Sequence, residues 1–131
     1  MNSGPQPIPE VRELSAEERG LVRWMLEAVG PEARPFLDQL EQTYVVARCP
    51  CGCASLDFAV RGRPLPEGPM RVLADFIFGS DDTLAGIVAF SQSGILGGVE
   101  VYSLSDRVTR ALPSPDALRP FHSVSTSEDD S

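Results

Sequence analysis

Residues 70–104, MRVLADFIFGSDDTLAGIVAFSQSGILGGVEVYSL, decide the fold of this 131-residue chain. Three runs rich in β-branched and aromatic residues are separated by two short polar segments, Ser-Asp-Asp at 80–82 and Ser-Gly at 93–94. Strand-forming residues interrupted by turn-forming residues are typical of consecutive antiparallel strands. The stretch therefore predicts a three-stranded antiparallel meander.

The predicted register of the meander assigns its side chains to two faces, because residues that oppose each other in antiparallel strands share a face. If residues 93–94 form a two-residue turn, Phe90 opposes Gly97. If residues 80–82 form a three-residue loop, Phe76 opposes Gly86. The core face then consists of Val72, Ala74, Phe76, Phe78, Leu84, Val88, Phe90, Ile95, Val99 and Val101. The second face carries Leu73, Asp75, Ile77, Ala85, Ile87, Ala89, Leu96, Gly98, Glu100 and Tyr102.

This second face is flat and largely apolar, which indicates that another surface covers it. Its small residues would let a second copy of the sheet approach closely, and an isologous pair is the commonest oligomer. The expected homodimer interface consists of Leu73, Ile77, Ala85, Ile87, Ala89, Leu96 and Tyr102. On this interpretation, Ala89→Arg leaves the fold intact and releases monomer.

The rest of the chain predicts two helices and two more strands. Ser15-Ala-Glu-Glu18 matches a capping box, and apolar residues at helical spacing follow it as far as Gly30-Pro31. A second, shorter helix is expected at 35–42, and strands at 43–48 and 54–60 are expected to form a hairpin. The expected fold is α+β, with two N-terminal helices packed on a mainly antiparallel five-stranded sheet.

A single domain is expected, because 131 residues can bury one core of ordinary size. Residues 1–12 are expected to be a disordered lead-in, residues 13–122 the α+β domain, and residues 123–131 a disordered acidic tail. Near the end of the domain, residues 113–121 predict one short turn of helix.

The net charge is −8, and much of it lies in the two terminal segments, so the folded part is nearly balanced. Nucleic acid and anionic membranes are bound by clustered Lys and Arg, so neither is an expected partner. No apolar run approaches the ~20 residues of a membrane span, and the N-terminus lacks the pattern of an export signal. We expect a soluble, cytoplasmic protein that binds another protein or a second copy of itself.

The chemically distinctive segment is Cys49-Pro-Cys51-Gly-Cys53, at the tip of the predicted hairpin. In an extended strand, alternate residues lie ~6.6 Å apart, too far for thiolates that share a zinc ion at ~2.3 Å each. Only a tight turn brings such sulfurs together, and Pro50 and Gly52 are residues that can build one.

Three interpretations of the cysteines stay open. A zinc site needs a fourth ligand, which Asp57, His122 or a second copy of the chain can supply. Redox chemistry through Cys51 and Cys53, or through a Cys49–Cys53 bridge, lacks a helix N-terminus that would lower a thiol pKa. Reduced cysteines with no role beyond the turn are favoured, because an odd number of cysteines without an export signal fits a reducing compartment. No cofactor is therefore expected, and zinc is the candidate ion of the metal interpretation.

The segment Arg48-Cys-Pro-Cys-Gly-Cys-Ala-Ser-Leu-Asp57 follows a helical N-terminus and precedes a sheet that ends Gly98-Val-Glu-Val-Tyr102. In this arrangement the chain resembles a set of small uncharacterised bacterial proteins that carry an R-C-x-C-G-C-x-S/T-hydrophobic-Asp segment. The resemblance covers residues 15–121. It implies neither an activity nor functional residues.

Phosphate-loop, dinucleotide-binding and zincin motifs are absent from the sequence. The best enzyme hypothesis is a carboxylate pair, because Asp75, Ile87 and Glu100 form one row of the predicted second face and set the acids ~10 Å apart. A solubilising role for both acids is preferred. The favoured function is therefore non-enzymatic protein–protein contact, and the alternative is a metal- or redox-linked module centred on the cysteine turn.

Overall fold

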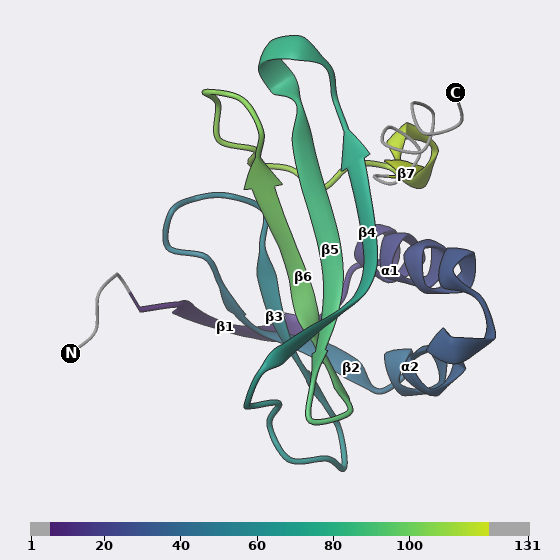
Figure 1. Cartoon of the computed structure of the whole chain (residues 1–131). Coiled ribbons are helices and arrows are strands. Elements are labelled where there is room, and N and C mark those ends of the chain that lie inside the picture. The colour runs from purple at the N-terminus through teal and green to yellow at the C-terminus, as the bar shows by residue number, and fades with distance from the viewer. Residues whose placement is uncertain (1–5, 121–131) are drawn as a thin grey trace.

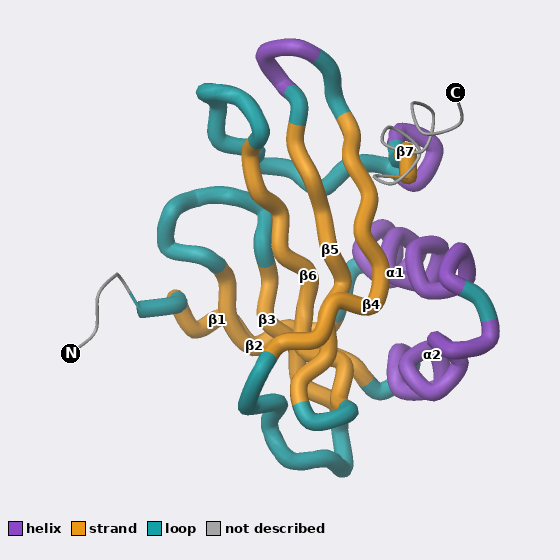
Figure 2. Tube along the Cα trace, viewed as in Figure 1, coloured by secondary structure: helices purple, strands orange, loops and turns teal. Residues whose placement is uncertain are grey.

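The computed structural model describes residues 6–120. Within this range the strands form one antiparallel sheet of seven strands, in the order β1-β2-β3-β6-β5-β4-β7, with two α-helices on one side of it (Figure 1). The strands are β1 (Ile8–Glu13), β2 (Thr43–Arg48), β3 (Leu56–Val60), β4 (Met70–Phe78), β5 (Ala85–Gln92), β6 (Ile95–Ser103) and β7 (Arg119–Pro120). The helices are α1 (Ala16–Val29) and α2 (Arg34–Leu40). Figure 2 shows the connecting loops gathered at the two ends of the strands.

The prediction of a five-stranded sheet is wrong, although the α+β class agrees with the structure. The two additional strands are β1 and β7 at the edges. Most of β1 lies in the predicted disordered lead-in, a prediction that follows from the glycine and prolines among the polar residues of the N-terminus. Glu10 in β1 pairs with Arg48 of β2 at 3.0 Å, so charged side chains rather than apolar alternation help to hold this edge.

The C-terminal edge of the sheet is the two-residue strand β7, which pairs with Phe76 and Ile77 of β4. Two residues are too few to produce a periodic pattern that sequence analysis can detect. The short helical turn expected before it is present as a 3₁₀ turn at Pro115–Ala117. The predicted acidic tail at 123–131 lies outside the described residues.

Helix α1 begins as its capping box predicts. The Glu18 N–H donates to Ser15 Oγ at 3.0 Å, and the Ser15 N–H donates to Glu18 Oε1 at 2.8 Å. Four buried side chains on one face of the helix pack into the core: Leu21, Val22, Met25 and Leu26. Burial of each such side chain stabilises the fold by roughly 2 kcal/mol. Among residues 6–120, no helix combines the length and apolar character needed to cross a bilayer.

A β-bulge in β6 and a longer loop between β4 and β5 change the predicted register of the meander. Beside the turn at 93–94, Ser91 pairs with Leu96, in line with a two-residue turn. One step further Phe90 pairs with Gly98, because Gly97 is an extra residue in β6. The predicted pairing of Phe90 with Gly97 is therefore wrong.

The loop between β4 and β5 spans residues 79–84 rather than the predicted 80–82, because its flanking pair is Phe78 with Ala85. Phe76 therefore pairs with Ile87 instead of the predicted Gly86, and a β-bulge between Val72 and Ala74 changes the offset again further along β4. A shift of one residue moves side chains to the opposite face of a sheet. Strand β5 consequently turns Ala85, Ile87 and Ala89 into the core. Val88 and Phe90 alternate with them and lie on the face away from the helices.

Glu18 also ties β1 to α1. Arg12 donates to both oxygens of its carboxylate, at 2.8 and 2.9 Å, in a bidentate pair. These hydrogen bonds from Arg12 lower the pKa of Glu18 against the opposite effect of burial, and the Ser15 N–H lowers it further.

We expect the Arg12–Glu18 ion pair to make the free energy of unfolding depend on pH in the acidic range. The pKa of Glu18 is lower in the folded state than in the unfolded state, where it is about 4.3. The contribution of Glu18 to the free energy of unfolding is therefore complete above the unfolded-state pKa and is lost as the pH falls through the folded-state pKa. Glu18→Gln keeps the capping-box geometry and should lower the free energy of unfolding by about 1 kcal/mol near neutral pH. Urea unfolding should show a smaller difference near pH ~2, where the wild-type carboxyl is also neutral.

Glu17→Gln is the control, because within residues 6–120 the Glu17 carboxylate forms no ion pair. If Glu18→Gln lowers the free energy of unfolding equally at both pH values, the charge of Glu18 is not the source of its stabilising effect.

Candidate metal centre

The loop between β2 and β3 forms a tight turn at the three cysteines. The Gly52 N–H donates to the Cys49 carbonyl at 3.4 Å, which closes a four-residue turn with Pro50 in its second position. Gly52 has a φ of 89°, a left-handed conformation that glycine adopts without strain. The Cys49 N–H donates to the Ser55 carbonyl at 3.3 Å and joins the two arms of the loop. The tight turn expected from Pro50 and Gly52 is confirmed.

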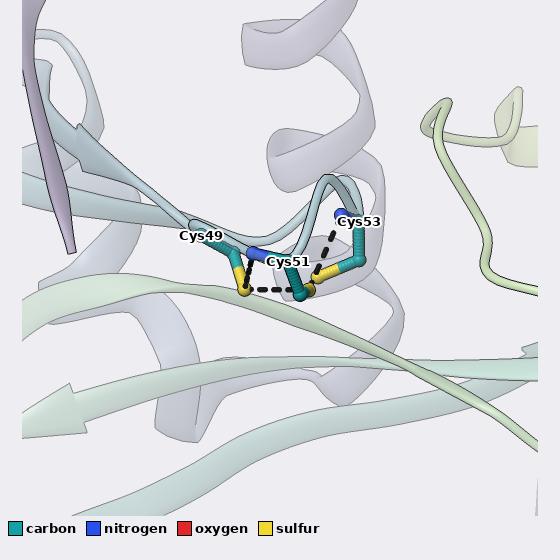
Figure 3. A group of neighbouring side chains, drawn as sticks. All are labelled: Cys49, Cys51 and Cys53. Atoms are coloured by element: carbon teal, nitrogen blue, oxygen red, sulfur yellow. Dashed lines mark hydrogen bonds between the residues drawn. The ribbon is translucent and has the colours of Figure 1, made fainter. Parts of the chain in front are cut away.

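The three cysteine side chains converge on one side of this turn (Figure 3). The Sγ atoms of Cys49 and Cys51 lie 2.7 Å apart, and all three Sγ atoms lie within 4.8 Å of one another. Three thiolates that share one ion at about 2.3 Å are separated from each other by about 4 Å. The sulfurs are therefore close enough together to bind one metal ion.

Backbone N–H groups of the turn point at the sulfurs. The Cys51 N–H donates to Cys49 Sγ at 3.4 Å, and the Cys53 N–H donates to Cys51 Sγ at 3.3 Å. Donors aimed at a sulfur favour its charged form. The turn thus supplies both the ligand atoms and N–H donors aimed at two of them.

Ser55 fixes the far end of the turn to β6. Its hydroxyl accepts from the Val101 N–H at 2.8 Å and donates to the Val101 carbonyl at 3.3 Å. The Cys53 thiol donates to the same hydroxyl at 3.3 Å. Sequence analysis did not single out Ser55, because its partner Val101 is distant in the chain. The available signal was a hydroxyl residue two positions after the last cysteine.

Cys49 and Cys53 differ in the pKa of their thiols. Burial raises the pKa of Cys49 to about 11, and the contact with Cys51 Sγ adds to the increase. Burial acts in the same direction on Cys53, but its hydrogen bonds with Ser55 and with the other two cysteines outweigh burial and lower the pKa of Cys53 to about 7. Of these two thiols, Cys53 is therefore the one more readily converted to a thiolate near neutral pH.

Two clefts border the turn, and Cys53 contributes to both. A cleft of about 400 Å³ is lined by the three cysteines and by Asp57 and Glu100. A second cleft of about 360 Å³ is lined by residues that include Arg48 and Arg110. Cys51 is exposed, and Cys49 and Cys53 are half-buried. An ion or small molecule can therefore reach the sulfurs from solvent.

The part of the chain that the structure describes supplies no fourth ligand to this group. Asp57 lines the first cleft, but its carboxylate is not a member of the cluster that the three sulfurs form. His122, the other predicted candidate, lies outside the described residues. The donors that residues 6–120 bring together are sulfur alone.

Arg48 and Arg110 flank the turn. Arg48 is paired with Glu10 at 3.0 Å. Arg110 lies against Gly52, where an added Cβ would be only 2.7 Å from Arg110 Nη1. The segment that carries Arg110 is fixed by the Ala54 N–H, which donates to the Thr109 carbonyl at 2.9 Å. Gly52 thus serves two purposes, the left-handed turn and the close approach of a guanidinium group.

The dimer interface predicted from sequence does not lie on one exposed face. Four of its residues are 0 % exposed and belong to the core: Ala85, Ile87, Ala89 and Leu96. Ile77 is also buried, Leu73 is half-buried at the bulge of β4, and Tyr102 is half-buried. The predicted composition of the second face is wrong because the longer β4–β5 loop and the bulge in β6 exchange the faces of β5.

The carboxylates of the enzyme hypothesis occupy one row of the sheet, as predicted, but Val88 rather than Ile87 lies between Asp75 and Glu100. Asp75 hydrogen-bonds instead with Tyr102, whose pKa is raised by burial and by the Asp75 charge. Asp75 Oδ1 is buried without a hydrogen-bond partner, and Glu100 is exposed. The geometry favours a Tyr102–Asp75 contact over a pair of acids acting on one substrate.

Comparison with protein-family models, with curated proteins and with solved structures gives no match to this chain. The resemblance to small bacterial proteins stays a prediction. Conclusions about the site therefore depend on its own geometry.

Proposed function

We propose that this is a small metal-binding protein whose turn of Cys49, Cys51 and Cys53 takes one thiophilic ion, of the class that includes zinc. The observation that supports the proposal is the convergence of three Sγ atoms within 4.8 Å of one another. Alternate side chains of an extended strand would lie ~6.6 Å apart. The homodimer favoured from sequence has lost its main support, because much of its interface lies in the core.

The site is suited to reversible binding rather than to holding the fold together. The large apolar core, with α1 and α2 on the sheet, contains none of the three cysteines. Metal-dependent domains such as zinc fingers lack a core of this kind and unfold without their ion. Exposure of Cys51 gives an ion a direct route in and out. The proposal places the protein in the reducing cytoplasm, where thiols stay free to bind metal.

Cobalt(II) is the probe for this site, because its thiolate complexes absorb in the near ultraviolet. The reduced full-length chain should bind one ion, as counted by native mass spectrometry, and show the thiolate band. Replacing any one cysteine by serine should remove most of the band, and the far-ultraviolet circular dichroism of metal-free protein should not change.

Ser55→Ala is the matched control, since it keeps all three sulfurs and removes only the hydroxyl that fixes Cys53 to β6. It should retain the thiolate band with a weaker affinity. A wild-type protein that takes up no cobalt or zinc when fully reduced would exclude the proposal, as would metal uptake that is unchanged when all three cysteines are replaced.

Thiol redox chemistry is the second candidate, favoured by the 2.7 Å between the sulfurs of Cys49 and Cys51. Oxidised glutathione would accept two electrons and two protons from these thiols, giving one protein disulfide and two molecules of glutathione. Intact mass after exposure to oxidised glutathione separates the two functions. Rapid loss of two hydrogens, by a protein that takes up no metal, would support the redox function.

A further inference from the structure

The donor atoms of the cysteine turn indicate which ion it prefers. Within residues 6–120 the cluster holds three sulfurs and neither an imidazole nor a carboxylate. Soft thiolate donors select copper(I) and zinc over harder divalent ions. Between these two ions, the number of available ligands is the distinguishing feature.

Zinc usually takes four ligands, all from the protein in structural sites and three from the protein with a water in catalytic ones. Here the candidates Asp57 and Glu100 line the same cleft without joining the cluster. Copper(I) has a filled d shell, imposes no fourth ligand and forms stable three-coordinate thiolate complexes. Three sulfurs from one five-residue turn satisfy its coordination, whereas they leave zinc dependent on water or on another residue.

The positive charge of Arg110 next to the turn also favours copper(I) over zinc. Three thiolates around a monovalent ion leave two negative charges uncompensated, one more than around zinc. Arg110 lies against Gly52 and lines the cleft that also contains Cys53. Within the described range, Arg110 forms no ion pair with a carboxylate, whereas Arg48 is occupied by Glu10. A guanidinium group in this position can balance an anionic metal–thiolate complex.

We propose that the cysteine turn is a copper(I) site in which Cys49, Cys51 and Cys53 bind the ion as three thiolates and Arg110 balances the charge of the complex. This inference rests on the proposed metal-binding function and specifies its ion. Arg110 is a positioning and charge-balancing residue, since it supplies no ligand atom.

Anaerobic competition tests the preference. Copper(I) is titrated into the reduced full-length protein against bathocuproine disulfonate, and zinc is titrated against a chromophoric zinc chelator. Copper(I) should bind at one ion per chain and resist displacement by zinc, and X-ray absorption should show a sulfur-only shell of three. Arg110→Gln should weaken copper(I) binding roughly 10-fold, as expected for an outer-sphere partner, and weaken zinc binding less.

Arg63→Gln is the matched control, because Arg63 is an exposed arginine of the loop between β3 and β4. It should leave both affinities unchanged. Zinc binding tighter than copper(I), with a fourth ligand removed by His122→Ala or Asp57→Asn, would overturn the copper inference and leave the metal-binding function standing. Failure to bind either ion would overturn both. Equal copper(I) affinity for Arg110→Gln and Arg63→Gln would overturn the part assigned to Arg110.

Discussion

Ala89→Arg is expected to unfold the protein rather than to release monomers from a dimer. Ala89 is 0 % exposed and pairs with Ala74 on one side and Val99 on the other, near the centre of the sheet. An arginine there would place an unpaired charge and a long side chain in a close-packed apolar core. The expected cost is on the order of 4 kcal/mol or more, a large share of the 5–15 kcal/mol that stabilises a typical domain.

Circular dichroism and urea unfolding measure this effect, and gel filtration tests the competing expectation. Val72→Arg is the control, because Val72 belongs to the neighbouring strand β4 and is 51 % exposed. It should change the free energy of unfolding by less than about 0.5 kcal/mol. A folded Ala89→Arg protein of reduced size would restore the predicted dimer face and contradict the register of β5.

The sequence predicted those elements whose signals are local. The capping box at Ser15 and Glu18 located the start of α1, and Pro50 and Gly52 located the turn that brings the sulfurs together. Each of these signals acts between residues close in the chain. The strands of the meander were also found, since turn residues separate them.

The faces of the meander were not predictable in the same way. Val88 and Phe90 are buried on one face of β5, while Ile87 and Ala89 are buried on the other. When both faces of a strand are apolar, the alternation of polarity no longer fixes the register. The extra residue Gly97 in β6 then shifted the pairing by one without changing the hydrophobic pattern.

The surroundings of the cysteines were missed for a different reason. Ser55 hydrogen-bonds to Val101, and Arg110 lies against Gly52. Both contacts join residues that are distant in the sequence, so only the fold brings them together. The motif alone could locate candidate ligands. It contains Arg48 and Ser55 without showing what they contact, and it does not contain Arg110.

Gly98→Ala should separate the two halves of the sheet and disable the cysteine turn. Strand β3 joins β6 through only two residue pairs, Leu56 with Val99 and Asp57 with Gly98. Gly98 has a φ of 151°, and a Cβ there would collide with the Leu56 carbonyl and lie 2.9 Å from the Phe90 ring. Backbone strain and the clash together should cost about 3 kcal/mol.

The consequence for the site follows from the position of the clash. Leu56 directly follows Ser55, so displacement of β3 breaks the hydrogen bonds between Ser55 and Val101.

Gly94→Ala is the matched control, because Gly94 also has a positive φ, 77°, but nothing lies within 4 Å of an added Cβ. It should cost about 1 kcal/mol from the left-handed backbone alone and leave metal binding unchanged. Urea unfolding and the cobalt thiolate band, measured on both variants, distinguish strain from loss of the β3–β6 pairing. If Gly98→Ala loses no more stability than Gly94→Ala and keeps full metal affinity, this pairing does not position the cysteine turn.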